Sequence, residues 1–185
     1  MKFARYFDHG QVNYGVVEGD NVVQIMGSPF ESYEITDHSH PISQVQLLAP
    51  CVPPKILAVG LNYKSHLGER PALKDPLIFY KTPISLIGPE EPILLPRDFD
   101  GRVDEEGEVV AVIKDRCKRV TKEDALNHVL GYTCGNDVSA RDWQKNDGQW
   151  WRAKSSDTFS VAGPFIVTDL DISDMMLRAR VNGNW

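Results

Sequence analysis

Val103-Asp-Glu-Glu-Gly-Glu-Val-Val-Ala-Val-Ile113 is a stretch in which a cluster of carboxylates leads directly into an apolar β-strand. Side chains two positions apart in a strand point to the same face, so we expect Asp104, Glu106 and Glu108 on one face and Glu105 on the other. Like charges this close repel one another unless a positive charge lies between them. A divalent cation that prefers oxygen ligands, such as Mg²⁺, would relieve that repulsion. A solvated acidic turn before a strand is the alternative interpretation.

The overall composition is that of an ordinary globular protein. The chain has 185 residues, of which 42% are hydrophobic and 25% are charged, which is enough to bury a core. A net charge of −6 argues against nucleic-acid binding. It is compatible with an acidic small-molecule substrate, because a bound metal inverts the local field. The sequence shows neither a signal-peptide pattern nor a membrane-spanning apolar run, so we expect a cytoplasmic protein.

The cysteines and most histidines carry no recognisable ligand pattern. Cys51, Cys117 and Cys134 are odd in number and lack a Cys-x-x-Cys spacing, so they predict reduced thiols and neither a disulfide framework nor a zinc site. Four histidines without a partner pattern are interpreted as structural or solvated, namely His9, His38, His40 and His128.

Two regions are expected along the chain. Residues 2–26 alternate as short strands separated by turns rich in glycine, asparagine and aspartate, which indicates hairpins. The proline-rich stretch 47–54 is typical of a stiff connector. We therefore expect a small N-terminal β-rich module over residues 1–50 and a larger domain over residues 54–185.

The larger region is predicted to be β-dominated with short helices. A turn of helix is expected over 62–70. The clearest helical pattern is 121–130, with Thr121 as its N-cap and Gly131 as its stop. Apolar runs predict strands at 55–60, 78–81, 93–95, 109–113, 163–168 and 176–181, and a further strand that begins at residue 132. The strand at 55–60 is expected to be buried.

His66 and Glu69 lie three residues apart in this predicted helical turn. Residues at that spacing share a helix face, so the carboxylate could orient the imidazole and raise its basicity. Such a pair suits a general base that acts on water. A chance pair on a surface helix is the alternative.

Two further segments carry candidate site residues. In Asn136-Asp-Val-Ser-Ala-Arg-Asp142, Asp137 could be a third metal ligand and Arg141 a bidentate anchor for a substrate carboxylate. An Asx-turn with a local ion pair is the alternative there. Lys154 follows the aromatic pair Trp150-Trp151 and could stabilise a developing oxyanion or enolate. The alternative is an exposed lysine.

Taken together, five segments resemble the fumarylacetoacetate hydrolase family. They occur in the family's order and cover most of residues 54–183. The matching segments are Val59-Gly-Leu-Asn-Tyr-Lys-Ser-His-Leu-Gly-Glu69, Pro76-Leu-Ile-Phe-Tyr-Lys81, the 103–113 stretch, Gly131-Tyr-Thr-Cys-Gly-Asn-Asp-Val-Ser-Ala-Arg-Asp-Trp-Gln144 and Lys154-Ser-Ser-Asp-Thr-Phe-Ser-Val-Ala-Gly-Pro164.

The resemblance implies a mixed β-roll catalytic domain behind a small N-terminal module, an α+β fold in which strands dominate. It also implies a Mg²⁺ or Mn²⁺ ion and a homodimer. By motif match, the metal ligands would be Glu106, Glu108 and Asp137. His66 and Glu69 would match the family's water-activating dyad, Lys154 its substrate-facing lysine, and Gln144 a position that often contacts substrate.

The chain departs from the family pattern in two places. Glu105 stands where members commonly have an aromatic residue before the first metal glutamate. The sequence stops at Val181-Asn-Gly-Asn-Trp185, whereas members continue through a Gly-Thr-Pro loop near the active site. We expect a fragment, a chain completed by a partner, or a catalytically impaired protein, and the sequence leaves these alternatives open.

The leading hypothesis is metal-dependent hydrolysis of a C–C bond in an acylpyruvate-like or fumarylacetoacetate-like 2-oxo or 1,3-dioxo carboxylate, through an enolate. An isomerase or decarboxylase of 2-oxo-dicarboxylates, of the 2-hydroxyhepta-2,4-diene-1,7-dioate type in aromatic catabolism, shares that intermediate. A non-catalytic scaffold subunit that keeps the metal pocket is the alternative from another class.

Overall fold

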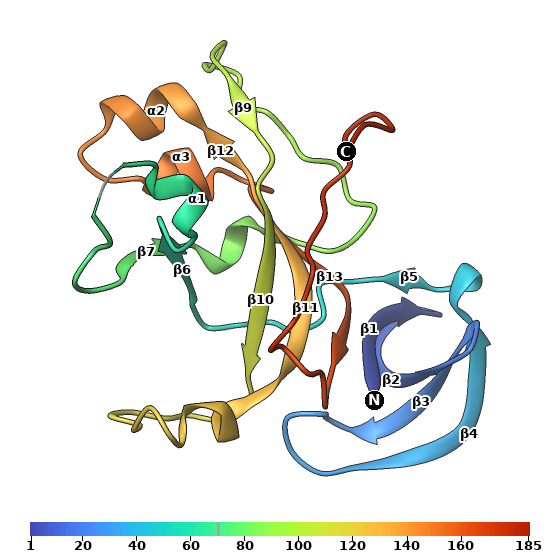
Figure 1. Ribbon diagram of the computed structural model, residues 1–185. Coiled ribbons are helices and arrows are strands. Elements are labelled where there is room, and N and C mark those ends of the chain that lie inside the picture. The colour runs from blue at the N-terminus through green and yellow to red at the C-terminus, as the bar shows by residue number, and fades with distance from the viewer. Residues whose placement is uncertain (70) are drawn as a thin grey trace.

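The computed structural model describes residues 1–69 and 71–185, except for the side chains of residues 64 and 65 (Figure 1). Strands dominate it, which confirms the predicted class. The strands are β1 Lys2–Asp8, β2 Gln11–Glu18, β3 Asn21–Gly27, β4 Tyr33–Pro41, β5 Gln46–Leu47, β6 Ile56–Gly60, β7 Leu77–Lys81, β8 Leu86–Ile87, β9 Val103–Asp104, β10 Gly107–Ile113, β11 Val129–Asp137, β12 Ser139–Ala140 and β13 Ser160–Val167. The helices are α1 Lys64–Leu67, α2 Arg141–Asn146 and α3 Trp151–Ser155, with 3₁₀ turns η1 Ile42–Gln44, η2 Pro83–Ser85 and η3 Ala125–His128.

The main sheet combines strands from the N-terminal hairpins with strands from the later part of the chain. Its strand order is β10-β11-β13-β1-β2-β3-β4, with β5 beside β1 and β8 beside β13. β8 runs parallel to β13, while the other neighbouring pairs are antiparallel, so the sheet is mixed. Lys2 of β1 lies opposite Val167 of β13, which joins the first hairpins to the later strands in one sheet. The division at residues 50–54 stays a prediction.

The first three strands form the hairpins that the sequence predicts. The β1–β2 turn places His9 at φ 44° and Gly10 at φ 83°, and the β2–β3 turn places Gly19 at φ 58°. Positive φ at a two-residue turn matches the right-handed twist of the flanking strands, which explains why these turns contain glycine. The sequence did not indicate β4, which extends the sheet beyond β3.

Buried side chains from both parts of the chain form the cores. The largest cluster joins the hairpins to β10 and β13 through Phe3, Val16, Ile25, Val112 and Ile166. A second cluster lies within the hairpins and consists of Ala4, Tyr6 and Val22. A third lies under the carboxylate-rich end of β10 and β11 and consists of Val138, Ala140 and Phe159. Since burial of such side chains dominates folding free energy, the third cluster gives the carboxylates a rigid support.

The predicted helix over 121–130 is wrong. A single 3₁₀ turn, η3, occupies its centre, and residues 129–130 belong to β11. Thr121 does cap a turn, since its Oγ1 accepts a 3.3 Å hydrogen bond from the backbone N–H of Asp124. Val129 lies opposite Ile113 of β10. β-Branched residues such as Val129 pack well in sheets, so the last residues of the predicted helix form a strand instead.

Two predicted strands are also absent from the described residues. Residues 93–95 and 176–181 carry apolar side chains but lie in irregular backbone apart from one isolated bridge between Val181 and Asn184. Instead of joining a ladder, the backbone N–H of Leu94 donates to Thr158 Oγ1 at 2.7 Å. An apolar run predicts a strand only where a neighbouring strand offers its backbone groups.

β6 forms as predicted, but it is not buried. Leu57 is 58% exposed and Val59 is 43% exposed. β6 pairs only with β7 in a separate two-stranded sheet, and alternate side chains of that sheet face outward. Among the described residues, no helix is long and apolar enough to cross a membrane.

Candidate active site

The carboxylates gather where β10 begins and β11 ends, at the upper end of this strand pair in Figure 1. Gly107 lies opposite Asn136, and the backbone N–H of Asp137 donates to the carbonyl of Glu106 at 2.9 Å. The Asn136 side chain accepts a 3.0 Å hydrogen bond from the backbone N–H of Glu106. These bonds hold Glu106 and Asp137 side by side, although they are far apart in sequence.

The predicted alternation along the acidic stretch is present. Asp104, Glu106 and Glu108 are partly buried, whereas Glu105 is exposed. Asp104 and Glu106 both contact the guanidinium of Arg141, at 2.8 Å and 2.7 Å. The burial therefore alternates as predicted, although Glu105 and Glu106 lie in irregular backbone between β9 and β10 and not within one strand.

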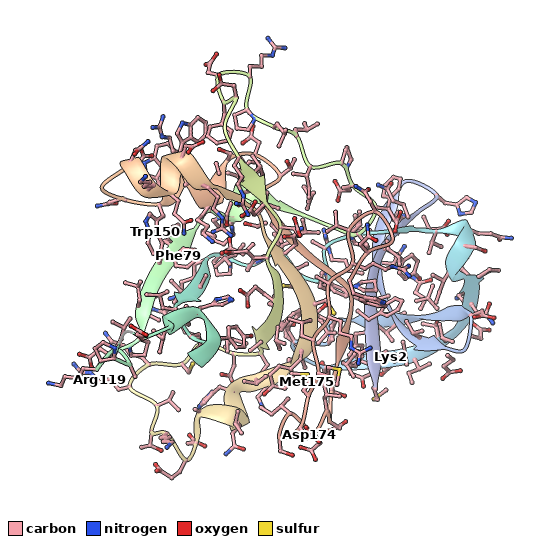
Figure 2. The ribbon with its side chains drawn as sticks, turned by 45° about the horizontal axis from the view of Figure 1, so that its top comes forward. Lys2, Phe79, Arg119, Trp150, Asp174 and Met175 are labelled. Atoms are coloured by element: carbon pink, nitrogen blue, oxygen red, sulfur yellow. The ribbon has the colours of Figure 1, made fainter. Side chains whose placement is uncertain are left out.

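Lys154 of α3 lies between two of these carboxylates. Its Nζ donates to Glu106 Oε2 at 2.5 Å and to Asp137 Oδ2 at 2.6 Å, and the residue is only 2% exposed. The ammonium also lies 5.3 Å from the centroid of the Phe79 ring. Phe79 in turn packs edge-on against Trp150, and Figure 2 labels both residues on the same side of the molecule. The alternative of an exposed lysine is therefore wrong.

A second buried lysine, Lys81 at the end of β7, completes this network and was missed as a site residue in the sequence. Its Nζ donates to Asp137 Oδ1 and to the carbonyls of Lys154 and Phe159. Burial lowers the pKa of Lys81, and the Asp137 carboxylate opposes that shift. The available signal was a lysine at the end of an apolar strand, which is a costly place for a charge unless it has partners.

Arg141, at the start of α2, directs its contacts to the chain's own side chains. Besides the two carboxylates, its Nη1 donates to Gln144 Oε1 at 2.9 Å. Ser139 Oγ adds a hydrogen bond to Glu106 Oε2 at 3.3 Å. The guanidinium therefore orients Glu106 and Gln144 in this structure.

The pKa values follow from this arrangement. Burial alone would raise the pKa of Glu106, but hydrogen bonds and charges from Lys154 and Arg141 outweigh it and lower that pKa. The pKa of Glu108 is raised, first by burial and then by the negative charges of Asp137 and Glu106. The described residues form no ion pair with Glu108 within 4.0 Å. Glu108 is thus the carboxylate that most needs added positive charge.

The donor set at this end of the sheet fits a hard divalent cation. Glu106, Glu108 and Asp137 offer only carboxylate oxygens, which Mg²⁺ and Mn²⁺ prefer. In the described structure, the carboxylate oxygens of these three residues do not all lie within 4.8 Å of one another. The donor atoms of a different group, Asp115, Cys117 and His128, do lie that close together.

His66 and Glu69 are not paired in this structure. α1 ends at Leu67, and Gly68 then turns the chain at φ 57°, so Glu69 does not follow His66 on a helix face. Both side chains are exposed, and among the described residues no hydrogen bond or ion pair joins them. The helix expected over 62–70 is thus shorter than predicted, and residue 70 lies outside the described residues.

α1 nevertheless lies beside the carboxylates. Burial and the nearby Glu108 carboxylate raise the pKa of Tyr63, which precedes α1. The His66 ring packs edge-on against Tyr63 with centroids 5.9 Å apart. When it is protonated, His66 also opposes the upward pKa shift of Glu108. His66, one residue of the predicted dyad, therefore lies near Glu108.

Two family models together match all of the chain except residues 51–54. The family model for the fumarylacetoacetate hydrolase C-terminal region matches residues 55–185. A model described as Rv2993c-like, N-terminal, matches residues 1–50. The chain belongs to the fumarylacetoacetate hydrolase family, as its five sequence segments predicted.

Named relatives include enzymes. A mitochondrial oxaloacetate tautomerase of Xenopus laevis is 42% identical over 174 residues, which is 90% of this chain and 53% of that protein. A 5-carboxymethyl-2-hydroxymuconate delta-isomerase from Mycobacterium smegmatis superposes with a TM-score of 0.91 at 46% identity, covering 100% of this chain and 73% of that one. A 2-hydroxyhepta-2,4-diene-1,7-dioate isomerase from Mycobacterium marinum gives a TM-score of 0.90 at 42% identity, with coverages of 100% and 72%.

A more distant structure contains a metal ion. Maleylpyruvate hydrolase from Sphingobium, solved with manganese(II) and pyruvate, gives a TM-score of 0.71 at 27% identity and covers 94% of this chain and 69% of that one. Together these structures confirm the predicted fold of the fumarylacetoacetate hydrolase type. Members of this family are enzymes, with isomerases, tautomerases and hydrolases among them.

Proposed function

We propose that this chain catalyses proton transfer at a carbon next to the carbonyl of a 2-oxo dicarboxylate, interconverting its keto and enol forms. The observation that carries the proposal is the buried ammonium of Lys154 between Glu106 and Asp137, at the start of β10. The names of the tautomerase and isomerase relatives support the same reaction class. This choice places isomerisation ahead of the C–C hydrolysis that the sequence favoured.

We propose that Glu106, Glu108 and Asp137 hold a Mg²⁺ or Mn²⁺ ion. When bound, such an ion supplies Lewis-acid polarisation of substrate oxygens. The oxygen-only donor set and the raised pKa of Glu108 support this assignment. The manganese in the maleylpyruvate hydrolase structure supports it as well.

The role proposed for Lys154 is to stabilise the enolate. A fixed ammonium next to a developing negative charge lowers the barrier without any rearrangement of solvent. The Phe79 ring lies beside this ammonium and packs against Trp150, and an apolar neighbour strengthens the field of the ammonium by excluding water. Lys81 holds the Lys154 carbonyl and Asp137, so it positions both groups.

Three other side chains receive roles in the proposal. His66 is the proposed proton acceptor, because it is exposed to an incoming substrate and lies beside Glu108. Glu69 would orient it once substrate draws the two together. Gln144, held by Arg141, would contact the substrate, and Arg141 would position Glu106 as well.

C–C hydrolysis of an acylpyruvate is the second candidate. The specific observation in its favour is the similarity to a maleylpyruvate hydrolase. It requires the same enolate, with His66 delivering water rather than accepting a carbon-bound proton. A decarboxylase on the same enolate, a homodimer in the cytoplasm, a place in aromatic catabolism and a non-catalytic scaffold role remain further proposals.

The test follows the enol form of oxaloacetate by its ultraviolet absorbance, with Mg²⁺ or Mn²⁺ present. Wild-type protein should speed the loss of the enol well above the metal-only rate. Lys154→Met and His66→Ala should return the rate close to that background, while acetylpyruvate cleavage is measured in parallel. Cleavage of acetylpyruvate without tautomerisation would contradict the proposal and favour a hydrolase. The absence of both activities would favour a non-catalytic scaffold.

A further inference from the structure

A second group of ligand-type side chains lies at the opposite end of the β10–β11 pair. Asp115 and Cys117 follow the last residue of β10, and His128 ends η3 just before β11 begins. The backbone N–H of Lys114 donates to the carbonyl of His128 at 2.9 Å, which ties the two segments together. They form the loop at the lower end of β10 in Figure 1, and Figure 2 labels Arg119 on it.

The donor atoms of this group already converge. One carboxylate oxygen of Asp115, the sulfur of Cys117 and one ring nitrogen of His128 all lie within 4.8 Å of one another. His128 Nδ1 lies 2.6 Å from Asp115 Oδ1. Bound Zn²⁺ holds sulfur at about 2.3 Å and nitrogen or oxygen at about 2.0–2.2 Å. Small side-chain movements would therefore bring the three donors to one ion.

The imidazole is also held from its other side. His128 Nε2 lies 3.5 Å from Asp124 Oδ2, and the other oxygen of Asp124 accepts a 2.7 Å hydrogen bond from Asn127. A carboxylate on the far nitrogen of a ligating histidine fixes its tautomer and makes the near nitrogen a better ligand. Asp124 is thus placed to orient the ring, with Nδ1 directed at Asp115.

We propose that Asp115, Cys117 and His128 form a binding site for a borderline-soft divalent metal, Zn²⁺ foremost, that is separate from the carboxylate site. Sulfur, nitrogen and oxygen donors together are the set that Zn²⁺ accepts, whereas Mg²⁺ takes oxygen ligands. Three protein ligands leave the fourth position to water. On binding, the Cys117 thiol releases its proton to solvent. A doubly protonated His128 ring also releases its Nδ1 proton to solvent, whereas a neutral ring protonated at Nδ1 shifts that proton to Nε2, next to Asp124.

Charge around the loop is mixed. The thiolate of Cys117 and the carboxylate of Asp115 neutralise a dication, and Asp124 adds a third negative charge nearby. The same segment carries positive side chains that oppose a cation, namely Lys114, Arg116, Lys118, Arg119 and Lys122. These side chains are exposed, so water and salt screen their repulsion, whereas the ligand bonds act at contact distance.

The test uses Co²⁺ as a spectroscopic substitute for Zn²⁺. A thiolate bound to Co²⁺ gives a charge-transfer band in the near ultraviolet, and the carboxylate site contains no sulfur. Titration of the wild-type protein should give this band, saturating at one ion per chain, and added Zn²⁺ should abolish it. Cys117→Ser and His128→Gln should remove the band.

Matched variants separate this site from others. Cys134 is exposed like Cys117 but lies outside the cluster, so Cys134→Ser should keep the band. Glu108→Ala should also keep it, which makes the result independent of the proposed catalytic metal. Circular dichroism of each variant checks folding. A wild-type protein without the band, a band that survives Cys117→Ser, or a band that disappears in Cys134→Ser would overturn the proposal.

Discussion

The two ends of the β10–β11 pair carry the two clusters of titratable residues, and they differ in what covers them. β10 has 7 residues, so its two ends lie roughly 20 Å apart at about 3.4 Å per residue. At the first end, Lys81 of β7 and Lys154 of α3 are buried and paired with carboxylates. At the second end, Asp115 and Cys117 are exposed.

Antiparallel pairing explains why both clusters exist. It brings the start of β10 to the end of β11 and the end of β10 to the start of β11, so distant residues meet twice. Burial then determines whether the charges of each cluster are paired within the protein or open to solvent. A buried charge must be paired, whereas an exposed cluster can exchange its protons for a metal from solution. Substitutions and metal binding at the two ends should therefore have different effects.

Lys81→Met should destabilise the protein by about 3–5 kcal/mol, because it removes one member of a buried ion-pair network. Urea unfolding measures the change. The control from the other end of β10 is Lys114→Met, an exposed lysine whose removal should cost no more than about 0.5 kcal/mol. Equal effects of the two substitutions would contradict the contrast between the ends.

Lys154→Met should lower the tautomerisation rate by about 10²–10³-fold, the range observed when one donor to a developing oxyanion is removed. Enzyme assays on folded protein measure this loss. Lys145→Met, an exposed lysine on α2, is the matched control and should keep the wild-type rate. Near-normal activity of the Lys154→Met protein would contradict a catalytic role for the buried cluster.

Zn²⁺ at 100 times its dissociation constant should stabilise the folded protein by about 2.7 kcal/mol. Thermal unfolding in the presence and absence of Zn²⁺ measures the shift, and His128→Gln should abolish it. Mg²⁺ at the same concentration should change the unfolding temperature of the His128→Gln protein and of the wild type equally, because the proposed Mg²⁺ site lies at the other end of β10. Zinc stabilisation that persists in His128→Gln would contradict the exposed site.

The smallest effect is expected at a His–Asp pair without a thiol, His9 and Asp8 in the first turn. The hydrogen bond to Asp8 raises the pKa of His9, and the same bond lowers the pKa of Asp8. The His9 contribution to stability is therefore full below its unfolded pKa and is lost as pH rises through the raised value. The Asp8 contribution is lost as pH falls through the lowered value.

The measurement is thermal unfolding against pH for the wild type and His9→Asn, since asparagine tolerates the positive φ of this turn. The stability difference should be greatest between the two pKa values and should shrink at either extreme. Zn²⁺ should not change it. A zinc effect as large here as at His128 would show that the exposed cluster has no special affinity.

Local patterns predicted those parts of the site that depend on neighbours in sequence. The period of two predicted that Asp104 and Glu106 point the same way, and both contact Arg141, although irregular backbone between β9 and β10 interrupts the strand. The turns of the first hairpins followed from glycine and its neighbours. The pairing of His66 with Glu69 required a longer helix than the chain forms, because Gly68 turns the backbone. Local spacing could not reveal that.

What the sequence determined by itself was the fold class, the family and most of the candidate site residues, because strand alternation, turn chemistry and motif order are local properties. The contacts of Lys81 and Cys117, in contrast, depend on how the strands and helices pack. Lys81 is paired because β7 and α3 meet over β11, and Cys117 faces His128 because β10 pairs with β11. Burial and long-range pairing depend on the whole chain, so no spacing within a segment encodes them.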